Sequence, residues 1–155
     1  MAECIFCKIV SGEIPSSKVY EDSQIIAFMD AGQVNPGHVI VTIKQHVPYI
    51  YDLNSDLAAA VFQAVVRISK AVKTAMQPAG MTLLQANEKA GWQTVEHFHI
   101  HVLPRHIEDG VTFTWPAKHP PKEELDRFAK RVRLGFSFAK YTNSRKPSAG
   151  GHFVH

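Results

Sequence analysis

The sequence is poor in cysteine: it has only two, Cys4 and Cys7, with two residues between them. Such a pair excludes the disulfide framework that holds many small secreted domains together. The first residues lack the basic and apolar regions of a signal peptide, and no apolar run is long enough to cross a membrane. We therefore expect a cytoplasmic protein without membrane contacts.

The chain also lacks a strong charge of either sign. Its 17 Lys and Arg residues and 14 Asp and Glu residues leave a net charge of +3, which suits a small anionic ligand and is too weak to indicate nucleic acid. The length of 155 residues, with 45% hydrophobic and 20% charged residues, is typical of one globular domain with a sizeable core.

Three histidines, His97, His99 and His101, alternate with apolar residues. A strand sends alternate side chains to opposite faces, so the histidines would share one face and Phe98, Ile100 and Val102 the core face. A helix would spread both sets around its circumference. The pattern therefore predicts a strand with a histidine-lined face.

Three interpretations fit such a row of imidazoles. The histidines are simply exposed on an alternating strand, or they bind one zinc ion that keeps an open position for water. In the third, one imidazole attacks a phosphorus or carbonyl centre while its neighbours orient it and bind anionic oxygens. The predicted geometry does not separate the last two.

Cys4 and Cys7 form a C-x2-C pair, which is half of a possible zinc site. The same pair occurs as a redox couple or as two buried thiols. The redox interpretation requires a βαβ setting, which the following residues do not suggest.

Alternation and turn residues predict strands over 18–20, 24–29, 38–44 and 81–87. A helix should begin at Asn54 or Ser55 and end before Pro78, with Phe62 and Val66 widening its apolar face. Residues 105–121 should form a long loop and 141–155 a flexible tail. A second helix should open at Pro121, with a packed side formed by Leu125, Phe128, Ala129 and Val132.

The segment from His97 to Leu103 resembles the signature of the histidine triad (HIT) family of nucleotide hydrolases and transferases. Residues 93–95 and 104–105 resemble the flanks of that signature, and a looser resemblance runs from Cys4 to about Arg133. The resemblance implies an α+β fold with an antiparallel five-stranded sheet, one long helix and one or two short ones. It also implies one domain over residues 1–140, and a homodimer in which the long helix lies at the interface.

The resemblance further implies reaction at the α-phosphate of adenosine or other purine nucleotides, such as phosphoramidates, through a covalent nucleotidyl-histidine. His99 would be the nucleophile, its second ring nitrogen held by a backbone carbonyl on a neighbouring strand. His101 and His38 would stabilise phosphate charge, and Gln93 would position the phosphate or the attacking water. A structural Zn²⁺, not required for catalysis, would be held by Cys4, Cys7, His46 and His97.

The substrate-binding residues also follow from the resemblance, although each has an ordinary structural interpretation as a core, cap or turn residue. Asp30 would accept hydrogen bonds from the ribose hydroxyls. One departure stands out, because Trp92 occupies the position where relatives often have glycine, and it would narrow or roof the site. The remaining contacts expected are with the base for Ile5, Phe6, Ile9, Phe28 and Met29, and near the phosphates for Asn87, Gln93, Thr94, His99 and His101.

Three alternatives remain open at this point. The first is a dinucleoside polyphosphate hydrolase that uses the same triad. The second is a mononuclear zinc enzyme with its metal on the three triad histidines. The third is a nucleotide-binding interaction module with little turnover.

Overall fold

The computed structural model describes residues 4–142, with side chains as far as Phe136. The chain divides into two compact units between Thr112 and Phe113, and each is described by itself. Within residues 4–142, none of the helices combines the length and the hydropathy that crossing a bilayer requires.

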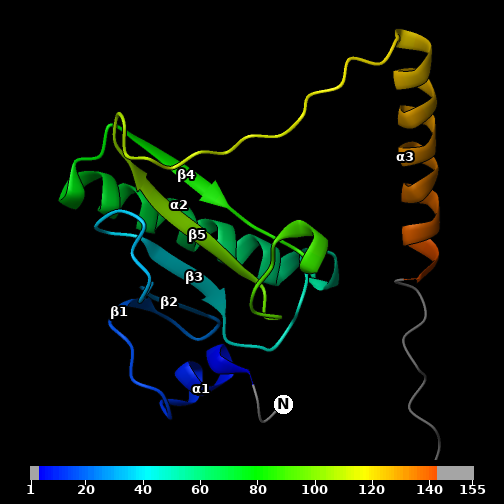
Figure 1. Cartoon of the computed structure of the whole chain (residues 1–155). Coiled ribbons are helices and arrows are strands. Elements are labelled where there is room, and N and C mark those ends of the chain that lie inside the picture. The colour runs from blue at the N-terminus through cyan, green and yellow to red at the C-terminus, as the bar shows by residue number, and fades with distance from the viewer. Residues whose placement is uncertain (1–3, 143–155) are drawn as a thin grey trace, which may run out of the picture. The chain divides into compact units, whose positions relative to one another are not determined.

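The first unit is an antiparallel five-stranded sheet in the order β1-β2-β3-β5-β4, which confirms the predicted α+β fold (Figure 1). The predicted strands are present, most of them a residue or two shorter than expected. Helix α1, which was not predicted, has only seven residues and ends at Gly12 in the left-handed conformation. The elements are α1 (Ile5–Ser11), β1 (Lys18–Glu21), β2 (Ile25–Met29), β3 (Val39–Ile43), α2 (Ser55–Met76), β4 (Gly80–Leu84) and β5 (His99–Arg105), with short 3-10 turns at Ile50–Asp52 and Lys89–Gly91.

Helix α2 begins as the sequence predicts. The Asn54 side chain accepts a hydrogen bond from the Leu57 backbone N–H at 2.9 Å, so it caps the first turn. The helix ends at Gln77, which adopts the left-handed conformation just before Pro78. Its buried side packs on the sheet through Leu57, Val61, Ala64, Val65, Ile68 and Val72.

The two faces of the sheet carry separate apolar clusters. On β2, Ile25 and Ala27 pack with α2, whereas Ile26 and Phe28 pack with Phe6 and Ile9 of α1. The period of two along a strand produces this division. Helix α2 therefore covers one face, and the short α1 lies against part of the other.

Strand β5 confirms the predicted alternation. Phe98, Ile100 and Val102 belong to the cluster under α2 and are buried. The ladder between β3 and β5 begins at the pair Thr42 and His99, so His97 lies just before the strand rather than within it. That displacement gives His97 different neighbours from those of the two later histidines.

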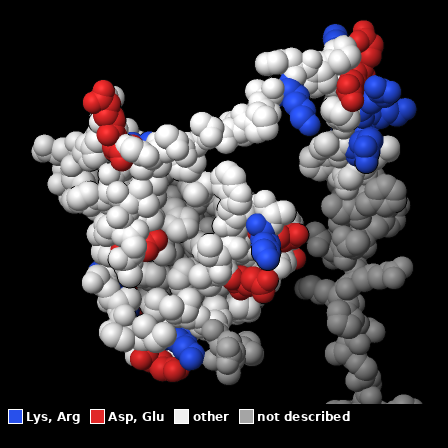
Figure 2. Space-filling model, in the orientation of Figure 1, with Lys and Arg blue, Asp and Glu red and all other residues white. Residues whose placement is uncertain are grey.

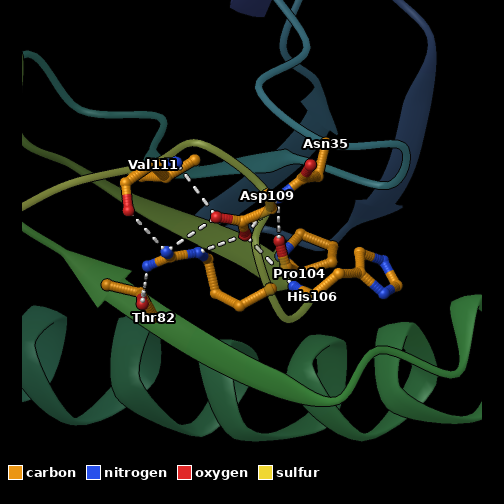
Figure 3. A network of polar contacts seen from close by, with 7 residues as sticks. Asn35, Thr82, Pro104, His106, Asp109 and Val111 are labelled. Carbon is orange, nitrogen blue, oxygen red and sulfur yellow. Dashed lines mark hydrogen bonds and ion pairs between the residues drawn. The ribbon is translucent and has the colours of Figure 1, made fainter.

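A network around Asp109 fixes the chain after β5 (Figure 3). The Asp109 carboxylate accepts hydrogen bonds from the Arg105 guanidinium at 2.7 and 3.0 Å and from Asn35 Nδ2 at 2.9 Å. Arg105 also donates to Thr82 Oγ1 on β4, and its proximity holds the pKa of Asp109 well below its usual range. The middle of β4, the end of β5 and the loop carrying Asn35 are thereby tied together.

The second unit contains α3 (Lys122–Thr142), preceded by residues 113–121 without helix or strand. The helix predicted after Pro121 is confirmed, and at 21 residues it is nearly as long as α2. The predicted packed side stays a prediction, because within this unit nothing covers Leu125, Phe128 and Val132, which are 51%, 46% and 64% exposed. A single helix has no second element in its own unit to cover them.

The predicted domain boundaries stay a prediction. Tyr141 and Thr142, the first residues of the expected tail, belong to α3, and 143–155 lie outside the described residues. On the face of the first unit drawn in Figure 2, charged side chains form small groups, several of which contain both signs.

Candidate active site

A cavity of about 660 Å3 opens on the sheet face that α1 partly covers. Phe6 and Phe28 form part of its apolar wall, with ring centroids 5.6 Å apart in an edge-to-face arrangement. Nine residues predicted to bind substrate line this cavity: Ile5, Phe6, Ile9, Phe28, Met29, Asp30, Thr94, His99 and His101. Apolar and polar groups therefore meet in one space, as a ligand with a flat base and an anionic part requires.

His99 is buried, and its Nδ1 lies 2.6 Å from the backbone oxygen of His97. A carbonyl oxygen can only accept, so Nδ1 carries the proton and Nε2 the lone pair. Burial lowers the pKa of His99, although the nearby Asp30 carboxylate opposes this, so the ring is neutral near pH 7. This is the protonation state that a nucleophilic imidazole needs.

The predicted location of that acceptor is wrong. The carbonyl belongs to His97, two residues earlier on the same segment, and not to a neighbouring strand. The ladder between β3 and β5 starts at His99, so the carbonyl before it remains free to accept from a side chain. The sequence pattern did not indicate where the regular ladder would begin.

Asp30, His38 and His101 bring three polar atoms together beside His99. His38 Nε2 lies 2.9 Å from His101 Nδ1, and Asp30 Oδ2 lies 3.4 and 3.7 Å from these two atoms. Burial and the neighbouring histidines lower the pKa of His101 to about 4, so it is neutral near pH 7. Asp30 directly follows β2 and His38 directly precedes β3, and the antiparallel pairing of these strands brings the two residues together.

The loop between Asp30 and His38 is held by Gln33, which the sequence analysis missed. Its Nε2 donates to the backbone oxygens of Asp30 at 2.6 Å and His38 at 2.7 Å. Its Oε1 accepts from the backbone N–H groups of Gly37 at 2.9 Å and His38 at 3.0 Å. No sequence period marks such a residue, because its role depends on the loop closing on itself.

Cys4, Cys7, His46 and His97 form a second cluster, whose donor atoms all lie within 4.8 Å of one another. The sulfur of Cys4 is 3.4 Å from His97 Nδ1, and that of Cys7 is 3.3 Å from His46 Nδ1 and 3.6 Å from His97 Nδ1. Sulfur and nitrogen ligands of one tetrahedral zinc lie about 3.6 Å apart. The four residues therefore fit a zinc ion.

The orientation of the His97 ring supports this fit. Its Nε2 lies 2.8 Å from the backbone oxygen of Ile43, so Nε2 carries the proton and Nδ1 presents its lone pair to the cysteines. Burial lowers the pKa of His97, which favours the neutral, ligating form. Among the residues with described side chains, His97 belongs to one candidate metal-binding cluster and His101 to another. This separation gives no support to one zinc ion on all three triad histidines.

Three predicted or noted residues lie away from the cavity lining. The Gln93 amide accepts from the Glu88 backbone N–H and donates to the Pro48 oxygen, both at 2.8 Å. Asn87 accepts from the Ile50 backbone N–H at 2.8 Å. Trp92 is 68% exposed and does not line the cavity, so it neither narrows nor roofs it. Roles for Gln93 and Asn87 at the phosphates stay predictions.

Comparison with known proteins now identifies the family. The family model described as "HIT domain" matches residues 11–108, which is more than half of the chain. The chain belongs to the HIT family. The match spans the sheet, α2 and the histidines around which both clusters are built.

Two curated relatives are similar over most of their length. The protein hit of Bacillus subtilis is 45% identical over 114 residues, which are 72% of this HIT chain and 78% of the relative. The adenosine 5'-monophosphoramidase hnt1 of Schizosaccharomyces pombe is 32% identical over 130 residues, or 83% of this chain and 95% of the relative.

Two solved HIT structures extend the comparison. A crystal structure of a HIT family protein from Bacillus anthracis has a TM-score of 0.82 and 38% identity, covering 86% of this chain and 96% of that one. A crystal structure of a zinc-bound histidine triad family protein from Mycobacterium smegmatis has a TM-score of 0.68 and 29% identity, covering 88% and 98%.

Proposed function

We propose that this HIT protein hydrolyses or transfers the nucleotidyl group of adenosine or other purine nucleotides, such as nucleoside phosphoramidates, by reaction at the α-phosphate. The observation that carries the proposal is the state of His99. Its Nδ1 proton is held by the His97 carbonyl, it is neutral, and its ring lines the cavity. The relatives named adenosine 5'-monophosphoramidase support this choice of substrate.

In the first step, Nε2 of His99 attacks the α-phosphorus. A P–N bond forms as the bond to the leaving group breaks, and the leaving group takes up a proton from solvent water, to which the attacking water of the second step later returns one. The proton stays on Nδ1 and is donated to the His97 carbonyl oxygen, and this hydrogen bond stabilises the positive charge on the ring. In the second step, water attacks phosphorus and the P–N bond breaks, which releases the nucleoside monophosphate and restores His99.

His101 acts in the opposite tautomer to His99. When His38 donates its Nε2 proton to His101 Nδ1, the second nitrogen of His101 carries a proton that it can donate to a phosphate oxygen. His99 and His101, two residues apart on β5, thus serve as nucleophile and hydrogen-bond donor. Placed donors of this kind stabilise the charge that develops on the non-bridging oxygens.

The rest of the cavity would hold the nucleoside. The Asp30 carboxylate would accept hydrogen bonds from the ribose hydroxyls. The Gly32 backbone N–H donates to its Oδ1 at 2.8 Å and so orients the carboxylate for this contact. The apolar wall around Phe6 and Phe28 receives the purine, and edge-to-face contacts suit its flat ring. Thr94 lies on the lining and would donate to the leaving group.

We also propose that Cys4, Cys7, His46 and His97 hold a structural Zn²⁺. When bound, the ion would link these four residues rigidly and would carry no reactive water, because protein ligands would fill its usual four positions. Its effect on the reaction is indirect, since fixing His97 also fixes the carbonyl that holds His99.

For assembly and location, we propose a cytoplasmic homodimer. Phe62 and Val66 on α2 are 47% and 52% exposed, and Leu83 on the edge strand β4 is 50% exposed. These side chains lie on elements that a second copy can cover, which supports the dimer. The purine nucleotide and the second copy are the only partners in this proposal.

Intact-protein mass spectrometry after mixing with an adenylated substrate tests the reaction class. We expect a nucleotidyl adduct in the wild-type protein and none in His99→Asn, while the variant still binds AMP. Full activity in His99→Asn would refute the assignment. Nucleotide binding with turnover no faster than the uncatalysed reaction would instead favour an interaction module.

A further inference from the structure

We propose that Asp30, His38 and His101 form a second metal site in this protein, which binds a divalent transition ion reversibly and excludes the nucleotide while it is occupied. The three donor atoms are Asp30 Oδ2, His38 Nε2 and His101 Nδ1, and they lie together within 4.8 Å. This site is separate from the cysteine and histidine cluster, with which it shares no residue.

The three distances between the donor atoms carry the proposal. They are 2.9, 3.4 and 3.7 Å, so a single point lies about 2 Å from all three atoms. Zinc binds imidazole nitrogen and carboxylate oxygen at about 2.0–2.2 Å. A zinc-sized ion therefore fits close to the plane of the three donors once the His38 and His101 rings, whose nitrogens face each other across 2.9 Å, turn toward the ion.

The donor set selects the class of ion. Two imidazoles and one carboxylate suit zinc, cobalt, nickel or copper, whereas Mg²⁺ and Ca²⁺ prefer oxygen ligands. Three protein ligands leave a position open, in contrast to the four ligands of the cysteine and histidine cluster. Asp30 and His101 both line the cavity and their side chains are each 22% exposed, so an ion can reach them from the solvent.

The site is also preorganised. Gln33 binds the backbone on both sides of the loop that carries Asp30 and His38, with bonds of 2.6–3.0 Å. The Gly32 backbone N–H occupies Asp30 Oδ1, which leaves Oδ2 directed at the histidines. An ion would replace the hydrogen bond between His38 and His101 rather than require the side chains to assemble.

Exclusion of the nucleotide rests on the proposed function of the cavity. Asp30 is proposed to bind the ribose, and His101 to donate to the phosphate. An ion bound to both side chains would occupy the carboxylate oxygen that the ribose needs, and it would hold His101 as a metal ligand. Metal and nucleotide should therefore compete for the same residues.

Titration of the metal-free protein with Zn²⁺ against a chromogenic chelator tests the site without measuring turnover. We expect two classes of bound zinc, a tight one at the cysteine and histidine cluster and a weaker one at Asp30, His38 and His101. Asp30→Asn should weaken only the second class, by at least about tenfold, because one of three ligands is lost. The Asn side chain can still accept from Gly32, so the loop turn is kept.

Further variants separate the possible outcomes. The double variant Cys4→Ser with Cys7→Ser should lose only the tight class, and His101→Gln should repeat the effect of Asp30→Asn. The exposed residue His106 provides a matched control, and His106→Asn should keep both classes. Unchanged weak-class affinity in both Asp30→Asn and His101→Gln would overturn the site.

AMP provides the second readout. Excess AMP should release zinc from the weak class of the wild-type protein and leave the tight class filled. If AMP binds without releasing zinc, mutual exclusion is wrong. If AMP does not bind while Asp30→Asn still loses the weak class, the metal site stands and the proposed nucleotide function fails.

Discussion

Two clusters flank the start of β5, and they use similar side chains for different purposes. Cys4, Cys7, His46 and His97 contribute two sulfurs and two nitrogens, and His97 is completely buried. Asp30, His38 and His101 contribute one oxygen and two nitrogens beside an open cavity. Sulfur ligands in a closed arrangement suit a permanent structural ion, whereas the open set suits a ligand that comes and goes.

The difference arises within five residues of chain. His97 precedes the ladder, so its ring turns toward α1, and its carbonyl remains free for His99. His99 and His101 lie within β5 and line the cavity. One phenyl ring touches both regions, because Phe6 lies 5.9 Å from the ring of His97 and 5.1 Å from that of His99. The first residue of β5 therefore separates His97, which belongs to the proposed structural zinc cluster, from the two histidines that line the cavity.

The largest expected effect comes from His99, on the chemical side of the comparison. His99→Asn should lower kcat by at least about 10^4-fold, since the nucleophile itself is lost. The thermal midpoint should change little, because the side chain contributes to the cavity wall rather than to the main core. Single-turnover kinetics and a thermal melt measure the two properties.

His97→Asn is the matched control for that pair of measurements. It should lower the thermal midpoint strongly, because His97 is a member of the cysteine and histidine cluster. It should reduce kcat much less than His99→Asn does, because the nucleophile remains and only the position of the carbonyl that binds it is disturbed. Equal losses of kcat in the two variants would contradict a division of roles between the clusters.

Removal of zinc should have the next largest effect, and on stability. A ligand present at a thousand times its Kd stabilises the folded protein by about 4 kcal/mol, and chelation would remove that amount. Urea denaturation with and without a zinc chelator measures the change. The double variant Cys4→Ser with Cys7→Ser should not respond to the chelator, and a response of wild-type size would show that the ion binds elsewhere.

Much of this arrangement was predictable from the sequence. The alternation of His97–Val102 predicted β5 and its core face, and Asn54 and Pro78 predicted the limits of α2, because these signals are local. The alternation could not show that the ladder starts at His99, since hydrogen bonding to β3 decides that point. The role of Gln33 and the positions of Gln93 and Asn87 depend on loop closure, which has no period in the sequence.

A substitution at Phe6 should weaken both the cysteine and histidine cluster and the cavity, because the ring contacts His97 and His99. Phe6→Leu removes ring contacts with Phe28, His97 and His99, and it should lower the free energy of unfolding by roughly 1–2 kcal/mol. AMP affinity should fall as well, because the ring is part of the cavity wall. Urea denaturation and equilibrium binding of AMP measure the two effects.

Ile5→Leu is a control for Phe6→Leu, because Ile5 also lines the cavity but is 46% exposed. It should leave stability within about 0.5 kcal/mol. If Phe6→Leu lowered AMP affinity without lowering stability, the ring would serve the cavity alone and would not link the two regions.

The smallest expected effect tests whether the open cluster depends on its loop. Gln33→Ala removes four hydrogen bonds that hold the backbone of Asp30 and His38. Loss of that support should reduce kcat/KM by about tenfold, since positioning errors of an ångström or less lower the rate without removing a reacting group. Gln33→Glu keeps the acceptor but sets a carboxylate oxygen against the two carbonyl oxygens that Nε2 now binds, so its loss of kcat/KM should be at least as large as that of Gln33→Ala. Because the cysteine and histidine cluster shares no residue with this loop, zinc of the tight class should be retained in both variants, and loss of that zinc would mean that the two clusters are not independent.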